Sequence, residues 1–163
     1  MKKIILLIAA MLIIASVTGC DMIKKKFSNC KSGTLGDKVE DSTGRSTYEG
    51  ANISLVSASS ESITVKIENN SASTWQSGNM RDYFLEGEKD GEWYRVEQIG
   101  GFANTMELMI FAPGDKLTHT FEFCERYGDL PSGKYRVVKT FWANATATAE
   151  AQEFYLICEF TVE

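Results

Sequence analysis

The sequence predicts an all-β fold, an antiparallel β-sandwich, for the part of the chain that follows residue 46. Three observations predict it. Apolar and polar residues alternate with period two in several short segments, these segments are rich in Val, Ile, Thr, Phe and Tyr, and turn signals separate them. Such alternation is typical of half-buried antiparallel strands, because successive side chains point to opposite faces of the sheet.

Each predicted strand is bounded by a turn signal. In "SITVKIEN" aliphatic residues alternate with polar ones, and "NNS" ends the strand. Asp90-Gly91 predicts a hairpin, because glycine tolerates the positive φ that hairpin turns demand. The predicted strands lie at 51–57, 62–69, 81–87, 92–98, 116–124, 133–142 and 153–162, with a weaker one at 104–110. About seven short strands favour an immunoglobulin-like sandwich over another antiparallel sandwich or a small barrel.

The stretch "LPSGKY" supports this topology. Tyr135 follows the turn that contains Gly133, at the start of the penultimate strand. A tyrosine corner occupies that place in immunoglobulin-like domains, with the hydroxyl bonded to the backbone a few residues upstream. The alternative is a core tyrosine without that bond.

The N-terminal segment predicts export and a lipid anchor. Lys2 and Lys3 precede an uncharged apolar run, which is the plan of a secretory signal. The run is shorter than the roughly 20 residues of a membrane-spanning helix. "VTGC" resembles the lipobox of bacterial lipoproteins, which implies that residues 1–19 are removed and that Cys20 carries the acyl chains, palmitate among them. An ordinary signal peptide is the alternative.

Residues 20–46 predict a flexible tether, because they are polar, rich in Gly, Ser, Thr and Lys, and lack sustained periodicity. The predicted organisation is therefore a lipoprotein signal peptide at 1–19, a tether at 20–46 and a sandwich domain at 47–163. The mature protein is expected at the cell membrane, lipid-anchored through Cys20 and facing the extracytoplasmic side. Two or more acyl chains give stable attachment, whereas one gives only reversible binding.

The charge disfavours nucleic acid as a partner. The chain carries a net charge of −5, and removal of residues 1–19 with their two lysines makes it −7. Phosphate binding needs a basic face, which this composition does not supply. We therefore expect no nucleic-acid partner, and no motif in the sequence indicates a cofactor.

The cysteines beyond Cys20 are Cys30, Cys124 and Cys158. No CxxC motif or Cys/His pair at ligand spacing indicates zinc. Strand parity places Cys158 on the inward face, as a small buried hydrophobe, and Cys124 on an outward face, so a disulfide between these two is not expected. A disulfide between Cys30 and Cys124 stays open, with free thiols as the favoured state.

The sequence offers little support for catalysis or for metal binding. His119 is the only histidine and shares the inward face of its strand with Leu117 and Phe121, which favours a neutral core histidine over a general base. The hairpin carries Glu86, Glu88, Asp90 and Glu92. Clustered carboxylates can collect calcium, but the spacing of a calcium loop is missing, so a solvated hairpin is preferred. We predict no enzyme and no metal site.

The predicted binding site lies on loops at one end of the sandwich. Trp75 and Gln76 belong to the polar stretch after the second strand, and Asn144 and Thr146 belong to the stretch before the last strand. These loops cluster in an immunoglobulin topology, and an exposed aromatic residue is a common binding anchor. The expected partner is an envelope or extracellular protein, or a glycan. Packing of Trp75 over the sheet edge is the alternative.

A resemblance brings these observations together. "ITVKIENNS", "YFLEGEKDGEW", "FAPGDKLTHTF", "YGDLPSGKYRVVK" and "EFTVE" resemble, in that order, the bacterial immunoglobulin-like domain of exported Gram-positive lipoproteins. The resemblance implies an extracytoplasmic binding or spacer module without catalytic residues. A looser similarity, through the Pro-Gly turn and "LPSGKY", runs to the intracellular proteinase inhibitors of bacilli, so a proteinase-inhibitor-like domain at the cell surface is the alternative function.

Overall fold

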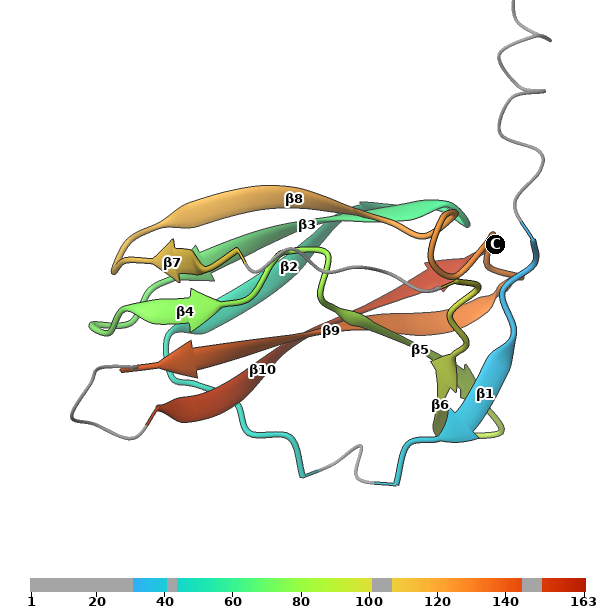
Figure 1. The fold of residues 1–163 in the computed structure, drawn as a ribbon, viewed down its shortest axis with the longest axis horizontal. Helices are drawn as coiled ribbons and strands as arrows, with labels where there is room; N and C mark the ends of the chain where they lie inside the picture. The colour runs from blue at the N-terminus through green and yellow to red at the C-terminus, as the bar shows by residue number, and fades with distance from the viewer. Residues whose placement is uncertain (1–30, 41–43, 101–106, 145–150) are drawn as a thin grey trace, which may run out of the picture. The chain divides into compact units, whose positions relative to one another are not determined.

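Ten strands form two antiparallel sheets that pack face to face, as the computed structural model shows for residues 31–40, 44–100, 107–144 and 151–163. The strands are β1 (Leu35–Lys38), β2 (Ala51–Ala58), β3 (Ser62–Asn69), β4 (Trp75–Ser77), β5 (Phe84–Lys89), β6 (Glu92–Val96), β7 (Met109–Phe111), β8 (Lys116–Glu122), β9 (Gly133–Ala143) and β10 (Gln152–Val162). The smaller sheet has the order β2-β3-β8, and the larger one the order β1-β6-β5-β9-β4-β7 with β10 paired to β9 (Figure 1). The predicted β-sandwich is confirmed.

Strand β9 organises the larger sheet. It pairs with β10 along its whole length, from Gly133 opposite Val162 to Ala143 opposite Gln152. Its other edge is shared, because β5 pairs with its first half and β4 with its last two residues. Both faces of the sheet therefore carry side chains from β5, β9 and β10 in fixed register.

The core lies between the sheets and follows the predicted period. The aliphatic residues of β3 and alternate residues of β10 are buried, whereas β9 is buried continuously from Tyr135 to Lys139 and alternates only after that. Aromatic rings fill the centre, with Phe141 and Phe154 stacked at 5.6 Å between ring centroids. Cys158 is a buried free thiol in this layer, as predicted.

The hairpin and the tyrosine corner are also confirmed. Asp90 and Gly91 have φ of 56° and 81°, which is the backbone that a two-residue turn between β5 and β6 requires. The Tyr135 hydroxyl donates to the Pro131 carbonyl at 2.8 Å. Gly133 begins β9 beside the Tyr135 ring.

The domain begins earlier than the sequence predicted. Gly33 donates its N–H to the Asp129 carbonyl at 2.7 Å, and β1 pairs with β6. Gly128, at φ of 80°, leaves room for the Lys31 carbonyl, since a Cβ there would lie 2.0 Å from it. The boundary at 47 and the flexible state of residues 31–40 were therefore wrong. Residues 20–30 of the predicted tether lie outside the described part of the chain.

Two further strands differ from the sequence prediction. The sequence predicts a loop where β4 lies, and β7 overlaps only the last two residues of the weak segment predicted at 104–110, of which residues 104–106 lie outside the described residues. Both are three residues long, which is too short for alternation to reveal. In the described part of the chain, no helix is long and apolar enough to span a bilayer.

Candidate functional site: a cleft on the outer face of the larger sheet

The predicted anchor Trp75 lies in the core and not on a loop tip. Its side chain has no exposed surface, its Nε1–H donates to the Ser71 hydroxyl at 3.1 Å, and its ring meets the ring of Phe154 edge to face. The expectation of an exposed Trp75 was wrong, because this residue begins β4 and the parity of that short strand turns it inward. A ligand at the surface does not reach this ring.

The other predicted site residues lie near that end of the sheet. Asn144 is exposed at the end of β9, with φ of 56°, and its N–H donates to the Thr74 carbonyl at 3.2 Å. Gln76 is partly exposed and lies opposite Trp142 in the ladder of β4 and β9. The prediction that these two segments approach each other is confirmed. Thr146 lies outside the described residues.

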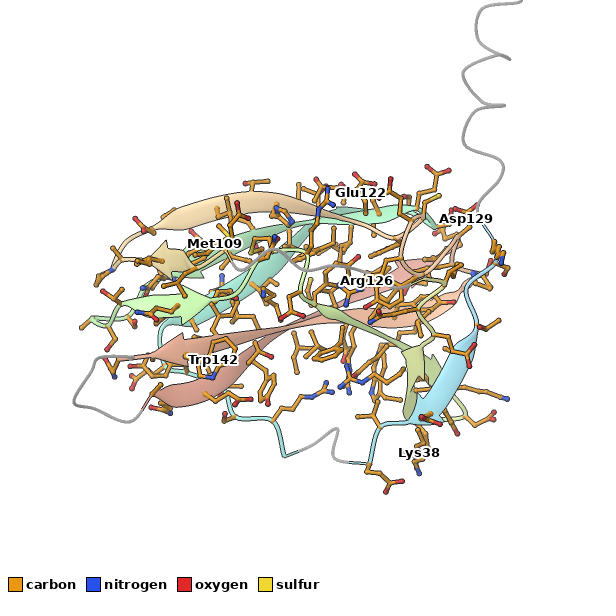
Figure 2. All side chains as sticks on the ribbon, in the orientation of Figure 1. Lys38, Met109, Glu122, Arg126, Asp129 and Trp142 are labelled. Atoms are coloured by element: carbon orange, nitrogen blue, oxygen red, sulfur yellow. The ribbon has the colours of Figure 1, made fainter. Side chains whose placement is uncertain are left out.

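A cleft of about 610 Å³ opens on the outer face of the larger sheet, the face turned away from the core. Its floor includes Val138 and Thr140, which alternate along β9 with the core residues. One side is formed by Val39, Glu40, Gly44 and Arg45, which lie between β1 and β2 in the sequence. The described residues between β1 and β2 lie below the larger sheet in the view of Figure 1. Trp142 and Lys38, both labelled in Figure 2, line the cleft and project from this face of the sheet.

The lining of the cleft is mixed in character. Its charged side chains are three cations and three anions: Lys38, Arg45, Arg95, Glu40, Asp82 and Glu153. Its aromatic side chains are Phe84, Trp142 and Tyr155. Phe84 is 38% exposed, so part of its surface is accessible from the cleft. The Tyr155 hydroxyl donates to the Glu153 carboxylate, so these two side chains hold each other in place.

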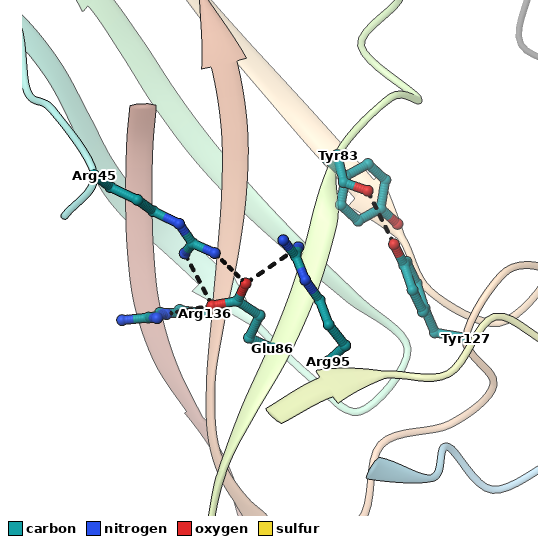
Figure 3. Close-up of polar contacts among 6 residues, drawn as sticks. All are labelled: Arg45, Tyr83, Glu86, Arg95, Tyr127 and Arg136. Atoms are coloured by element: carbon teal, nitrogen blue, oxygen red, sulfur yellow. Dashed lines mark hydrogen bonds and ion pairs between the residues drawn. The ribbon is translucent and has the colours of Figure 1, made fainter. Parts of the chain in front are cut away.

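Beside the cleft, Glu86 binds three arginines that come from separate parts of the chain (Figure 3). Arg45 donates two hydrogen bonds to its carboxylate, at 2.9 and 2.5 Å. Arg136 donates through Nε at 2.8 Å, and Arg95 lies 3.1 Å away as an ion pair. Register explains two of these contacts, because Glu86 stands opposite Arg95 on β6 and Arg136 on β9.

The electrostatics of this cluster keep Glu86 ionised. Its side chain has no exposed surface. Burial by itself raises the pKa of this carboxyl, but the hydrogen bonds from Arg45 and Arg136 outweigh it, and the net result is a lowered pKa. Glu86 was expected on a solvated acidic hairpin, and for this residue the expectation was wrong. It belongs to a buried ion cluster that fixes two arginines of the cleft, Arg45 and Arg95.

The arginines also stack on aromatic rings. The Arg95 guanidinium lies 3.8 Å from the centroid of the Phe84 ring, and Arg136 lies 4.0 Å from that of Trp93. Arg45 lies 5.8 Å from the Tyr155 ring. Such contacts contribute about 0.5–2 kcal/mol each. Two aromatic side chains of the cleft, Phe84 and Tyr155, are therefore held by cations as well as by packing.

A buried lysine holds another part of the cleft lining in place. Lys139 points inward from β9 and is 1% exposed. Its Nζ donates to the main-chain carbonyls of Asp82 at 2.7 Å, Asn79 at 3.1 Å and Gly78 at 3.4 Å. Burial lowers the pKa of Lys139 to about 8. Because Asp82 lines the cleft, this lysine positions the turn that carries a cleft carboxylate.

The remaining chemistry-bearing residues form no catalytic arrangement among the described residues. His119 is half-buried on β8, with its ring 4.7 Å from that of Phe121, so its predicted inward direction is confirmed. Burial, and then the charge of Lys139, lower the pKa of His119 and keep it neutral at pH 7. No group of three His, Cys, Asp or Glu residues in the described ranges could hold a metal ion.

The cysteines follow the prediction only in part. Cys158 is free, so the absence of a bond between it and Cys124 is confirmed. Cys124 is disulfide-bonded, and the favoured free state of this thiol was wrong. Cys20 and Cys30 lie outside the described residues.

The sequence could have indicated part of this cleft. One face of β9 carries a cation, an aliphatic residue, a hydroxyl and an aromatic ring, from Arg136, Val138, Thr140 and Trp142. A face that only contacts water would be expected to carry mostly polar residues. Arg45 gave no such signal, because it lies 41 residues from Glu86 in a stretch that resembles a tether.

The fold and the comparison with known families agree on the class of protein. A two-sheet antiparallel sandwich with a tyrosine corner is the architecture of immunoglobulin-like domains. The family model described as Bacterial Ig-like domain matches residues 49–154, which is more than half of the chain. The chain therefore belongs to the bacterial Ig-like domain family, whose members are typically extracellular and non-catalytic modules. No curated protein sequence matches it.

Proposed function

We propose that this protein is a lipid-anchored, extracytoplasmic binding module of a Gram-positive envelope, and that it holds its ligand in the cleft on the outer face of the larger sheet. Three features support this proposal. The basic start, short apolar run and "VTGC" box are those of a lipoprotein signal. The family is one of extracellular modules. The cleft has the size and polar–aromatic lining of a ligand site.

The anchor keeps the site close to the membrane. With Cys20 acylated, the eleven residues that lead to Lys31 reach at most about 40 Å when fully extended. From Lys31 onward the chain is bonded to the domain. A module on so short a stem serves ligands within the cell envelope better than ligands far outside it.

The main support for the proposal is that the side chains of the cleft are held in place before a ligand binds. Glu86 fixes Arg45 and Arg95, and Lys139 fixes the turn with Asp82. Binding by side chains that are already ordered avoids the entropic cost of immobilising them, which is about 0.5–1.5 kcal/mol for each. A spacer needs no such arrangement on its exposed face.

The proposal is tested by affinity capture from envelope fractions and culture fluid, with the full-length protein displayed in membranes. We expect a component that the wild-type protein retains and Trp142→Ala loses, while Ile110→Ala retains it. Ile110 is 60% exposed on β7 and does not line the cleft, so it controls for loss of an apolar surface side chain. Equal retention by all three proteins, or by none, would contradict the proposal.

Anchoring has its own test. Metabolic labelling with palmitate is expected to mark the wild-type protein and not Cys20→Ala, and cell fractionation is expected to release the variant from the membrane. Proteinase inhibition stays a prediction, and a captured protease that the protein inhibits would favour it.

A further inference from the structure

We infer that the ligand of the outer-face cleft is a neutral glycan, recognised by aromatic stacking and by hydrogen bonds to its hydroxyl groups. The inference rests on the proposed binding function and adds the chemical class of the ligand. Three properties of the cleft carry it: the balance of its charges, the face of the sheet on which it lies and the accessible aromatic rings.

The charges of the cleft balance. The three cations and three anions of the lining cancel, and the adjoining buried pair of Glu86 and Arg136 adds no net charge. Lys38 is further engaged by Glu92, which lies outside the lining, at 3.2 Å, so the cleft has no excess of cations. A site for phosphate or another anion needs an excess of cations, and a site for a cation needs the reverse. Donors and acceptors side by side suit hydroxyl groups, each of which both donates and accepts.

The position of the cleft disfavours an extended peptide. Peptides that add a strand to a sheet bind through the free main-chain groups of an edge. The floor of the cleft is the face of β9, whose main chain pairs with β10 on one side and with β5 and β4 on the other. Recognition at this floor therefore depends on side chains.

The aromatic side chains supply the apolar part of recognition. Phe84 is 38% exposed, and Trp142 and Tyr155 are partly exposed. A pyranose ring presents C–H groups on its faces and hydroxyl groups around its rim, so it can lie on an aromatic ring while its rim meets charged side chains. The cleft combines both parts: Tyr155 stands beside the Glu153 carboxylate, and Phe84 lies under the Arg95 guanidinium.

The inference is tested by direct binding of defined oligosaccharides. The full-length protein, extracted in a detergent without a sugar headgroup, is titrated by calorimetry with tetramers of β-1,4-glucose, α-1,4-glucose and β-1,4-N-acetylglucosamine, and with tetragalacturonate as the anionic counterpart. We expect saturable binding of a neutral tetramer that changes little between about 50 and 500 mM salt, because screening acts on charges. Binding of tetragalacturonate alone would overturn the inference.

Variants locate the site. Trp142→Ala is expected to weaken binding at least tenfold, which corresponds to about 1.4 kcal/mol. Trp142→Phe keeps an aromatic face and is expected to restore most of the affinity, which a merely destabilised fold would not explain. Glu153→Gln is expected to weaken binding several-fold through loss of an acceptor. Ile110→Ala is expected to bind as the wild type does, and an equal effect of Ile110→Ala and Trp142→Ala would contradict the assignment.

Failure of the inference can be told from failure of the proposed function. If no neutral oligosaccharide binds but envelope capture still depends on Trp142, the cleft is a binding site and the glycan class is wrong. If the captured component is a protein, the same conclusion follows. If capture is also independent of Trp142, both the inference and the proposed function are wrong.

Discussion

Glu86 on β5 and Arg136 on β9 are paired in register on adjacent strands of the larger sheet, and the Arg136 Nε–H donates to the Glu86 carboxylate at 2.8 Å. This pair is the buried centre from which the cleft is built. Arg45 and Arg95 share the same carboxylate and line the cleft. One buried carboxylate thereby couples the stability of the domain to the geometry of its candidate site.

Replacement of Glu86 by glutamine is expected to destabilise the domain by about 3–5 kcal/mol, because it leaves three guanidiniums together without their counter-charge. Urea unfolding at pH 7 measures the change. Glu159→Gln is the matched control. Its exposed ion pair with Lys134, at 2.7 Å, is expected to contribute less than about 1 kcal/mol. Equal losses in the two variants would show that Glu86 is not a central ion partner.

The lowered pKa of Glu86 predicts a loss of stability in acid. In the folded state this carboxyl holds its proton less well than in the unfolded chain. Its contribution is therefore complete above the ordinary glutamate pKa of about 4.3 and is lost as the pH falls from there through the lowered folded value. The stability difference between wild type and Glu86→Gln, measured by urea unfolding from pH 7 downward, should shrink over this window. A constant difference would contradict the prediction.

Lys139 predicts a gain of stability at alkaline pH. Its folded pKa is about 8, below the ordinary lysine value of about 10.4, so the unfolded chain binds more protons between these values. Stability is expected to rise by about 1.5 kcal/mol from pH 8 to 9.5, as the buried ammonium loses its proton. Lys139→Met should remove this rise. Thermal unfolding of both proteins over that range measures it, and parallel curves would contradict it.

Cys124 is disulfide-bonded and Cys158 is free, so with Cys20 acylated we expect Cys30 to be the partner of Cys124. Burial raises the pKa of the Cys158 thiol and makes it unreactive in the folded protein. An alkylating reagent should then label no thiol in the native protein and only Cys158 after unfolding without reductant. Cys30→Ser should expose Cys124 to the reagent. Labelling of Cys124 in the unreduced wild-type protein would contradict the pairing.

The strands that the sequence predicted well are those with a local signal. β3 was predicted with its observed bounds and β10 to within one residue, because period-two alternation over eight or more residues is visible along the chain. β9 was also predicted to within one residue, because the turn that contains Pro131 and Gly133 marks its start. The hairpin turn at Asp90-Gly91 and the tyrosine corner at Tyr135 were also predicted, because each depends on a few neighbouring residues.

The site was less predictable because its contacts are distant in sequence. Arg45 reaches Glu86 across 41 residues, and Arg136 reaches it across 50. Neither contact can be predicted from local composition. The sequence therefore predicted that Arg45 belongs to a flexible tether and that Glu86 lies on a solvated hairpin. Trp75 was misplaced for a related reason, since a three-residue strand is too short to show which way its side chains turn.

By itself, then, the sequence determined that this chain forms a β-sandwich with a tyrosine corner. The strands follow from local periodicity, and the corner follows from the residues of the turn before Tyr135. The sequence also carries the signal that predicts a lipid anchor. Only the tertiary structure decided which strand faces carry the arginines and aromatic rings together, that the chain from Lys31 belongs to the domain, and that a cleft lies on the outer face of the larger sheet. The physical reason is that register and sheet pairing, which local sequence does not specify, place residues such as Arg45 and Glu86 within hydrogen-bonding distance.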